Sequence, residues 1–331
     1  MTGSADKKPV EWRFETVPAD EDNSRLDRFL RRLVPGLAQG SIERMLRNGL
    51  IRVDGAKAKA NSRINAGQSV RLPPDLQPAS TKPAPPSPHI IAHADVRQKF
   101  DDMVLAEGRG WLAINKPSGL AVQGGTSIAL HIDGMLKALA AHTNGRLRLV
   151  HRLDKDTSGV LLLAKTLESA RTLTEAFHRH KFEKTYHAII SRVLDESTII
   201  EENIGRHPIN RKRMAVTSNG KHAKSIVKPI TNLVNSSHVE IKIITGRTHQ
   251  IRVHMSYLNH PIIGDKLYGY RKNIFNKYPD LIKHIDPTFG QYLHAYSLSF
   301  RDNVSGKMKS FNADYPAQYN SLLENMNEYL S

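Results

Sequence analysis

The sequence contains no cysteine among its 331 residues. This absence excludes disulfide bonds, a thiolate nucleophile and zinc held by cysteine. The sequence also has no apolar run long enough to cross a bilayer. The segment Met1–Trp12 is polar and has neither the apolar stretch of a secretion signal nor the arginine-rich face of a transit peptide. We therefore expect a cytoplasmic protein with no membrane partner.

Several motifs of common enzyme classes are missing as well. There is no G-x-x-x-x-G-K-S/T loop for ATP, and Ser158 does not lie in the G-x-S-x-G turn of many hydrolases. His249 and His254 are five residues apart, so they do not share a helical face as the two histidines of H-E-x-x-H do. We predict no metal site and no nucleotide cofactor.

Positive charge is the most informative feature of the composition. Lys and Arg number 48 and Asp and Glu number 32, which gives a net charge of +16. A polyanionic partner such as nucleic acid favours this excess of cations, because each phosphate contact releases counterions. An acidic membrane surface or a generally basic exterior would fit the same composition.

Proline marks a division of the chain. Seven of the 17 prolines lie between Pro73 and Pro88, where they favour an extended linker without regular backbone hydrogen bonds. We predict four segments: a polar tail at residues 1–23, a small basic domain at 24–72, a linker at 73–95 and a large domain at 96–331.

The small domain has the pattern of two short helices followed by strands. Apolar residues recur at helical spacing from Leu26 to Leu33, after a cap at Ser24, and a second helix runs from a cap at Ser41 to Gly49. Strands are expected at 50–53 and 69–72. Between Arg25 and Leu72 there are eleven Lys and Arg but three Asp and Glu. The helices display five arginines that we expect to contact RNA: Arg28, Arg31, Arg32, Arg44 and Arg47. A solvated helical face is the alternative.

The stretch RLDRFLRRLVPGLAQGSIERMLRNGLIRVDGAKAKANSRINAGQSVRL, residues 25–72, resembles the S4-like RNA-binding domain. The resemblance covers nearly the whole segment. It implies that this small α/β domain binds structured RNA.

The larger segment reads as mixed α and β. Apolar runs at 111–114, 160–163 and 239–244 predict strands, and residues 169–180 and 248–257 predict helices. No regular alternation of strand and helix appears. The expected class is α+β, with a mixed, mainly antiparallel sheet in the larger domain.

Two polar clusters carry the candidate chemistry. His151-Arg152-Leu153-Asp154-Lys155-Asp156-Thr157-Ser158-Gly159 lies between two apolar runs, as catalytic loops on a scaffold do. Gly246-Arg247-Thr248-His249-Gln250-Ile251-Arg252 follows a predicted strand and opens a helix, whose start favours anions. Arg252 could hold Asp154 ionised and in place. A charged turn and a structural ion pair are the alternatives.

These clusters resemble the motifs of the RluA-type pseudouridine synthases. HRLDKDTSG (151–159) and GRTHQIRVHM (246–255) are similar to two of that family's motifs. Four shorter matches accompany them in order: NKPSGL (115–120), KTYHA (184–188), HPIIGD (260–265) and LHA (293–295). The resemblance runs from Val104 to the C-terminus, and its features are closest to the RluC-like subtype.

The resemblance implies an isomerase that converts uridines of large-subunit ribosomal RNA to pseudouridine as a monomer and without a cofactor. It makes Asp154 the catalytic carboxylate and Arg252 its cationic partner. Tyr186 would stack on the flipped base or take the C5 proton. Four residues within the two longer motifs would face RNA: His151, Arg152, Arg247 and His249.

Two other functions remain open at this point. A non-catalytic RNA-binding or ribosome-assembly protein would have the same composition and basic segment, although it should have lost Asp154, Arg252 or Tyr186. A hydrolase could use Asp154 and Asp156 as an acid/base pair, but the basic segment would then need another explanation.

Deleting residues 1–88 should weaken binding of the target RNA and leave weak activity, because the basic segment supplies phosphate contacts but none of the candidate chemistry. Affinity of full-length and shortened protein for the same RNA would be measured by filter binding. Unchanged affinity after the deletion would contradict the role assigned to this segment.

Overall fold

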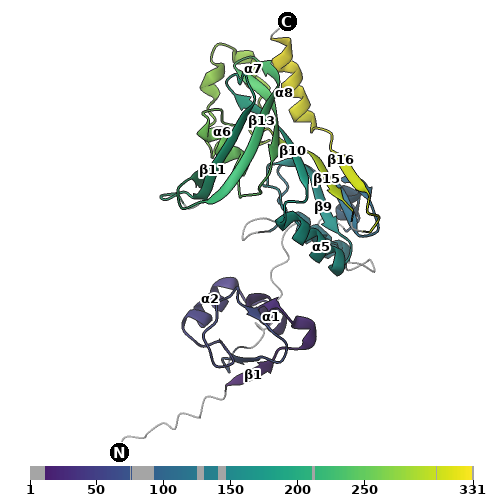
Figure 1. Cartoon of the computed structure of the whole chain (residues 1–331), viewed down its shortest axis with the longest axis vertical. Coiled ribbons are helices and arrows are strands. Elements are labelled where there is room, and N and C mark those ends of the chain that lie inside the picture. The colour runs from purple at the N-terminus through teal and green to yellow at the C-terminus, as the bar shows by residue number, and fades with distance from the viewer. Residues whose placement is uncertain are drawn as a thin grey trace, which may run out of the picture. The chain divides into compact units, whose positions relative to one another are not determined.

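The computed structural model describes residues 12–74, 76, 93–124, 130–140, 147–210, 213–302 and 304–329. The chain divides into two compact units, Met1–Pro88 and His89–Ser331 (Figure 1). Most of the predicted linker lies outside the described residues.

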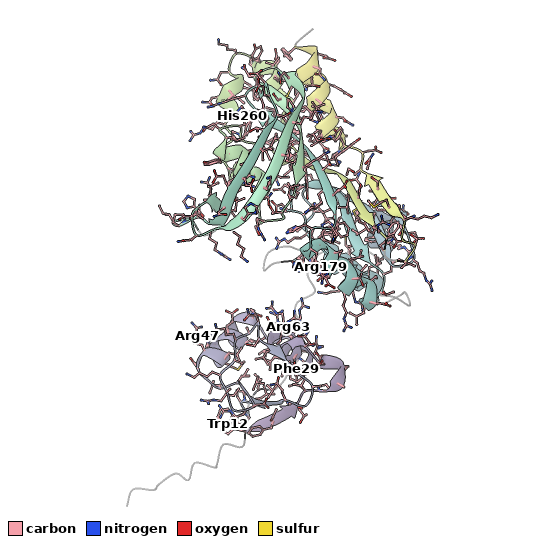
Figure 2. The ribbon with its side chains drawn as sticks, viewed as in Figure 1. Trp12, Phe29, Arg47, Arg63, Arg179 and His260 are labelled. Carbon is pink, nitrogen blue, oxygen red and sulfur yellow. The ribbon has the colours of Figure 1, made fainter. Side chains whose placement is uncertain are left out.

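The N-terminal unit combines short strands with two helices around one apolar core. Its elements are β1 (Arg13–Thr16), η1 (Ala19–Glu21), β2 (Ser24–Arg25), α1 (Leu26–Leu33), α2 (Gln39–Arg47), β3 (Arg52–Val53), β4 (Arg63–Ile64) and β5 (Ser69–Leu72). The strands form a sheet in the order β1-β5-β3 and a separate β2-β4 pair. Figure 2 shows Phe29 inside the unit and Arg47 and Arg63 at its edge.

Two details of the predicted small domain were wrong. Residues 13–16 belong to the sheet as β1, and Val17 is buried in the core, so this part of residues 1–23 is no polar tail. Neither Ser24 nor Ser41 caps a helix: Ser24 lies in β2, and α2 already begins at Gln39. The backbone N–H groups that open α1 donate instead to carbonyls of the loop at 60–62, which makes a side-chain cap unnecessary.

The C-terminal unit is built on one sheet of eleven strands. They are β6 (Val104–Glu107), β7 (Trp111–Lys116), β8 (Arg148–Leu149), β9 (Ser158–Ala164), β10 (Glu183–Ser191), β11 (Thr198–Arg206), β12 (Met214–Val216), β13 (Lys221–Leu233), β14 (Ser236–Ile243), β15 (Leu293–Arg301) and β16 (Met308–Asn312). The order is β12-β11-β13-β14-β10-β15-β9-β7-β6, with β8 on β9 and β16 on β15. All pairings are antiparallel except that of β15 with β9. The expected α+β class with a mainly antiparallel sheet is confirmed.

Helices cover both faces of this sheet (Figure 1). They are α3 (His93–Asp101), α4 (Ile132–Ala140), α5 (Leu167–His178), α6 (Gln250–Tyr257), η2 (Lys272–Phe275), α7 (Pro279–Lys283) and α8 (Ala317–Glu328). None of the helices in the described ranges combines the length and apolar character that a bilayer span needs.

The side chains along each strand alternate between the two faces of the sheet, which explains why helices cover both faces. In β7, Leu112 and Ile114 join the cluster that includes α3 and α4, whereas Trp111 and Ala113 join the opposite cluster with α5. Successive side chains of a strand point to opposite faces, so a strand that is apolar throughout must be buried on both. The same division at the other half of the sheet puts α6 on one face and α7 and α8 on the other.

A histidine–tyrosine cluster lies where α8 packs near the sheet. Its buried members are His187, His238, His294 and Tyr319, and Tyr296 and Tyr315 are half-buried. His294 links two distant segments, because its Nε2–H donates to the carbonyl of Ala313 at 3.0 Å and its Nδ1 accepts from the hydroxyl of Ser158 at 2.8 Å. Burial lowers the pKa of His187 to about 3, and that of His238 and His294 to about 4.

These histidines should make the protein sensitive to acid. Their pKa values in the fold lie below the unfolded value of about 6.5. Below that pH the unfolded chain takes up protons that the folded protein does not, so the free energy of unfolding, which is highest above pH 6.5, decreases as the pH falls. By pH 5 each should lower the free energy of unfolding by roughly 2 kcal/mol at most. Urea unfolding at pH 7.5 and pH 5 would measure the difference.

The variant His238→Phe provides the sharpest test, because the Nε2 of His238 has no hydrogen-bond partner within the described residues. The variant should lose less stability than the wild type between the two pH values. The same change at exposed His178 is the control and should leave the pH dependence as it is. Equal pH dependence in all three proteins would contradict the assignment.

Candidate active site

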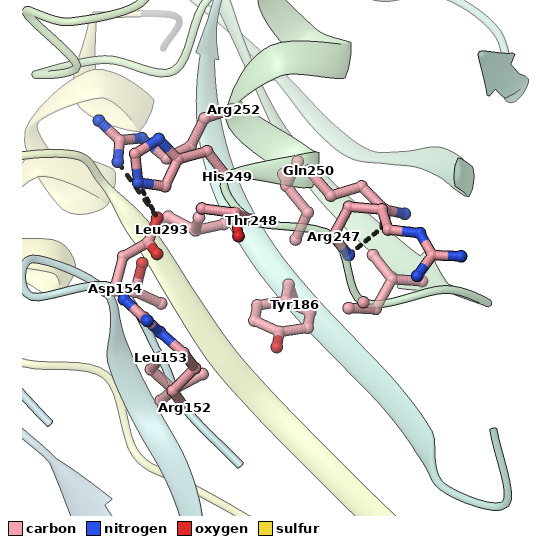
Figure 3. Close-up of a pocket in the computed structure, with 14 residues that line it drawn as sticks. Arg152, Leu153, Asp154, Tyr186, Arg247, Thr248, His249, Gln250, Arg252 and Leu293 are labelled. Carbon is pink, nitrogen blue, oxygen red and sulfur yellow. Dashed lines mark hydrogen bonds and ion pairs between the residues drawn. The ribbon is translucent and has the colours of Figure 1, made fainter. Parts of the chain in front are cut away.

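A small pocket of about 140 Å³ brings together the two polar clusters of the sequence (Figure 3). Its lining comes from the loop before β9, from β10, from the end of β14 and the turn that leads into α6, from the start of that helix, and from the start of β15. Asp154 is the one carboxylate among the lining residues, and Asp156 does not line the pocket.

Buried polar groups of the Asn115–Gly119 segment hold the loop that carries Asp154. The fully buried ammonium of Lys116 donates to the carbonyls of Lys155, Pro117 and Leu120 at 2.8 to 2.9 Å. The hydroxyl of Ser118 lies 2.9 Å from the carbonyl of Asp156. Burial lowers the pKa of Lys116 to about 7, and the charges of Asp156 and Asp154 oppose that shift.

The far end of the loop is fixed by contacts with β15 and the residues before it. The side-chain amide of Gln291 donates to the hydroxyl of Thr157 at 3.1 Å. Gly159 has a φ of +107°, and a Cβ there would lie 2.2 Å from the carbonyl oxygen of Ala295. Glycine therefore allows β9 to approach β15 at this point. The loop is held along its backbone, which leaves the side chain of Asp154 free to face the pocket.

Arg252 is the central electrostatic group of the site. Its Nη1 donates to Oδ2 of Asp154 at 3.1 Å, and its Nε and Nη2 donate to both oxygens of Asp265 at 2.6 and 2.9 Å. Arg252 is 8% exposed and Asp265 is 1% exposed. Burial alone would lower the pKa of Arg252, but the hydrogen bonds and charge of Asp265, together with Asp154, outweigh burial and raise it.

Asp265 depends on a turn that only glycine permits. Gly264 has a φ of +81°, and a Cβ there would lie 1.9 Å from the carbonyl oxygen of Gly290. One oxygen of Asp265 also accepts the backbone N–H groups of Leu267 and Tyr268 at 3.1 and 3.2 Å. The carboxylate therefore orders the turn and orients Arg252 at the same time.

His249 takes the left-handed conformation just before α6, with a φ of +56°. The predicted helix start at Thr248 was therefore two residues early. Gln250 braces this turn: its Oε1 accepts the N–H of Arg247 at 3.0 Å, and its Nε2 donates to the carbonyl of Lys224 at 3.0 Å. Strained backbone of this kind persists where neighbouring contacts hold it.

Tyr186 lines the pocket from β10, on a different part of the wall from Asp154 and its partners (Figure 3). The pairing of β10 with β15 is irregular between Thr185 and His187, and such bulges re-aim the side chain at that position. Burial, and then the charge of Asp154, raise the pKa of Tyr186 well above its usual value. Its phenol therefore keeps its proton at neutral pH.

Arg152 and Arg247 line the same pocket, and Arg152 is exposed. His151 was expected to face RNA, but the structure gives it a packing position. Its Nε2 accepts the backbone N–H of Leu162 at 2.8 Å, and its ring stacks on Phe177 with the centroids 4.3 Å apart. Burial lowers the pKa of His151 to about 3, so the ring is neutral. We remove His151 from the RNA-facing residues.

The five arginines singled out in the N-terminal unit are all exposed on α1 and α2: Arg28, Arg31, Arg32, Arg44 and Arg47. Arg32 pairs with Glu21, and Arg31 donates to Gln39 at 2.7 Å. Arg28, Arg44 and Arg47 form no ion pair with any described residue. Arg47 also lines a groove of about 550 Å³ with Lys57 and Lys59.

Sequence reasoning placed Asp154, Arg252 and Tyr186 in one site, and all three line the pocket. It gave no role to Asp265, Tyr268 or Lys116. The signal for Asp265 was present in the motif HPIIGD, since a glycine before an acidic residue indicates a tight turn that presents a side chain. Nothing local in the sequence marks Tyr268.

The arrangement suits chemistry that begins from an ionised carboxylate. Oδ2 of Asp154 is held by Arg252, whereas Oδ1 has no hydrogen-bond partner among the residues described. An aromatic ring, Tyr186, and the cations of Arg152 and Arg247 share the pocket. In the described ranges, no three acidic or histidine side chains gather as a metal site requires.

The chain is similar to proteins of one kind. Residues 110–257 match the family profile described as RNA pseudouridylate synthase. The chain is 31% identical to ribosomal large subunit pseudouridine synthase C of Vibrio cholerae over 326 residues, which cover 96% of this chain and 99% of that protein. It is 36% identical to the protein of the same name from Rickettsia bellii over 311 residues, or 90% and 96% of the two chains.

Two further similarities agree with these. Ribosomal large subunit pseudouridine synthase D of Neisseria meningitidis is 32% identical, over 93% of this chain and 80% of that protein. Among solved structures, human RNA Pseudouridylate Synthase Domain Containing 4 has a TM-score of 0.58 at 24% identity, covering 71% of this chain and 96% of that one.

Breaking the pair of Arg252 and Asp265 should strongly destabilise the C-terminal unit. Asp265→Asn leaves a buried guanidinium with Asp154 as its one remaining anion, and losing one partner of a buried pair costs about 3 to 5 kcal/mol. Urea denaturation of Asp265→Asn, Arg252→Met and the double variant would measure the coupling between the two residues.

The exposed pair of Lys283 and Asp280, also 2.6 Å apart, is the control. Removing either partner there should leave the free energy of unfolding nearly unchanged, because water screens an exposed pair. Losses of equal size at the two pairs would contradict the central role given to Asp265.

Proposed function

The chain belongs to the RNA pseudouridylate synthase family and is an RNA pseudouridine synthase, and from this premise we propose that it isomerises specific uridines of large-subunit ribosomal RNA with Asp154 as the catalytic carboxylate. Relatives named for the large ribosomal subunit match over nearly their whole length, which supports this substrate. Such relatives carry both C and D names. We favour the C-like subtype, because the S4-like segment, the run NKPSGLAVQGG at 115–125 and the loop HRLDKDTSG resemble it most.

The reaction conserves every atom. The glycosidic bond between N1 and C1′ breaks, the uracil turns, and C5 bonds to C1′ while the C5 proton leaves and N1 gains one. No electron donor or phosphate transfer is required. Asp154 would start the reaction by attacking C1′, by attacking the base, or by removing a sugar proton. Each route needs an ionised carboxylate with an accessible oxygen, and the contact between Arg252 and Oδ2 supports that state while leaving Oδ1 unengaged.

Tyr186 is assigned to stacking on the target base. Its ring is part of the pocket wall, and a π face accommodates any flipped base. The raised pKa of its phenol disfavours its use as a base at neutral pH. Stacking therefore fits the structure better than removal of the C5 proton.

The target uridine must leave its helix to reach Asp154, and unstacking costs a few kcal/mol. Arg152 and Arg247, which line the pocket together with His249, are assigned to the RNA around the target. His249 was also expected to face RNA, but its two ring nitrogens lie near Tyr268 and Asp154, so we assign it to the site itself. The N-terminal unit is proposed to be an S4-like domain that binds structured RNA through the exposed arginines of α1 and α2.

We further propose that the enzyme works as a monomer in the cytoplasm, where ribosomal RNA would be its partner, with no membrane partner and no nucleotide or metal cofactor.

Neither rival function has comparable support. A non-catalytic protein would not need the intact set of Asp154, Arg252 and Tyr186 in one pocket. A hydrolase with Asp154 and Asp156 as its acid and base would need both carboxylates at the substrate, and Asp156 does not line the pocket.

Asp154→Asn should abolish pseudouridine formation while keeping RNA affinity, because the change removes the charge and leaves the size of the side chain. Large-subunit rRNA transcript and ribosomal particles would be incubated with each protein, and pseudouridines would be mapped by carbodiimide labelling and primer extension. Asp156→Asn, the matched control in the same loop, should retain activity.

New stops with the wild type and with Asp156→Asn, but none with Asp154→Asn, would establish the reaction and its carboxylate. Primer-extension stops with Asp154→Asn as well would show that Asp154 is not the catalytic carboxylate. No stops with any protein on either substrate would contradict the proposed substrate.

A further inference from the structure

A second group faces Asp154 beside Arg252. The Nε2 of His249 lies 3.8 Å from Oδ2 of Asp154, the same oxygen that Arg252 contacts (Figure 3). The other ring nitrogen, Nδ1, lies 2.7 Å from the hydroxyl of Tyr268. His249 thus stands between a phenol and the candidate catalytic carboxylate.

The surroundings of Tyr268 decide which atom carries the proton in its contact with His249. The phenol oxygen already accepts the backbone N–H of Met214 at 2.9 Å. Burial raises the pKa of Tyr268, so the phenol keeps its hydrogen at neutral pH. Nδ1 of His249 is the acceptor within hydrogen-bonding distance of that hydrogen. Donation from Tyr268 to Nδ1 therefore satisfies both groups.

The position of Asp154 gives the same answer independently. When Nδ1 of a neutral imidazole accepts a hydrogen bond, Nε2 carries the ring proton. The polar N–H of Nε2 then lies near an anionic oxygen 3.8 Å away, a charge–dipole contact that is attractive although too long for a hydrogen bond. The opposite tautomer would set the lone pair of Nε2 against Oδ2 of Asp154, which is repulsive.

Burial favours the neutral form of the His249 ring. Burial lowers its pKa, Asp154 and Asp265 oppose the shift, and Arg252 and Arg152 add to it. Protonation would also place a hydrogen on Nδ1, opposite the hydrogen that Tyr268 directs there. A neutral ring keeps one defined donor toward the pocket.

Tyr268 is itself placed by the turn that Asp265 orders. Its backbone N–H donates to Asp265 at 3.2 Å, and its ring lies 4.9 Å from the guanidinium carbon of Arg252. The ring of His249 meets that of Tyr268 edge-on, at 84°. One carboxylate, Asp265, thus positions both groups that flank Oδ2 of Asp154.

We infer that Tyr268 is a positioning residue that fixes His249 as the Nε2–H tautomer, and that this N–H acts with Arg252 on Oδ2 of Asp154 so that Oδ1 faces the target nucleotide. The inference deepens the proposed function and rests on it for its catalytic consequence. The tautomer itself is a property of the protein alone.

The tautomer can be read directly from the ring nitrogens. Full-length protein with ¹⁵N-labelled histidine would be examined by long-range ¹H–¹⁵N correlation at pH 7.5, with His249→Asn to identify the signals of His249. The wild type should show a protonated Nε2 and a bare Nδ1. Tyr268→Phe should convert His249 to a mixture of tautomers. A wild-type ring protonated at Nδ1, or a ring unaffected by Tyr268→Phe, would overturn the inference.

Rates then test the consequence for Asp154. Under single-turnover conditions with large-subunit rRNA, Tyr268→Phe should lower the rate about tenfold, which corresponds to one lost neutral hydrogen bond, while the Kd for RNA stays within about twofold because no RNA contact is removed. Tyr257→Phe is the matched control, since the exposed hydroxyl of Tyr257 donates to Glu202 and lies outside the site.

A wild-type rate in Tyr268→Phe would overturn the catalytic part of the inference. Inactivity of the wild type, combined with the expected tautomer, would instead contradict the proposed substrate and leave the assignment of His249 intact. Urea unfolding of each variant distinguishes a slower site from an unfolded one.

Discussion

The site depends on one buried arginine held between two carboxylates. Arg252 comes from α6, Asp154 from the loop before β9, and Asp265 from the turn after the helix. A guanidinium removed from water must be paired on several of its N–H groups, so packing of these three segments must bring both carboxylates to Arg252. Asp265 is the structural partner and accepts two hydrogen bonds from Arg252. Asp154 accepts one, on Oδ2, and its Oδ1 has no hydrogen-bond partner among the described residues.

Burial favours the uncharged form of the other titratable groups around this ion pair. Tyr186, His249 and His151 are each shifted toward their uncharged forms. Desolvation disfavours charge wherever no partner compensates for it. The charge of Asp154 therefore faces a pocket whose other buried groups act through hydrogen bonds and ring faces, while the exposed arginines remain available to phosphates.

Much of this could be predicted from sequence because the signals are local. The apolar runs of β7, β9 and β14 predicted a sheet. The two polar clusters that flank such runs, with their resemblance to family motifs, predicted the site. Long-range effects were missed: the start of α1 is satisfied by carbonyls of the loop at 60–62, so Ser24 was not needed as a cap. His151 directly precedes the pocket residue Arg152 in the sequence, yet its ring packs on Phe177. The partnership of Tyr268 with His249 depends on a turn that no spacing pattern encodes.

The one parallel pairing of the sheet has a consequence for how the protein is made. β9, which follows the loop of Asp154, obtains its neighbour β15 from a segment about 135 residues later in the chain, at the register of Ser158 with His294. Contacts this distant in sequence form late, since the loop must close before they stabilise anything. A ribosome must therefore release the chain as far as β15 before this pairing can form. The loop of Asp154 is braced only after β15 has been made, and a chain truncated within β15 lacks the strand that β9 pairs with in parallel.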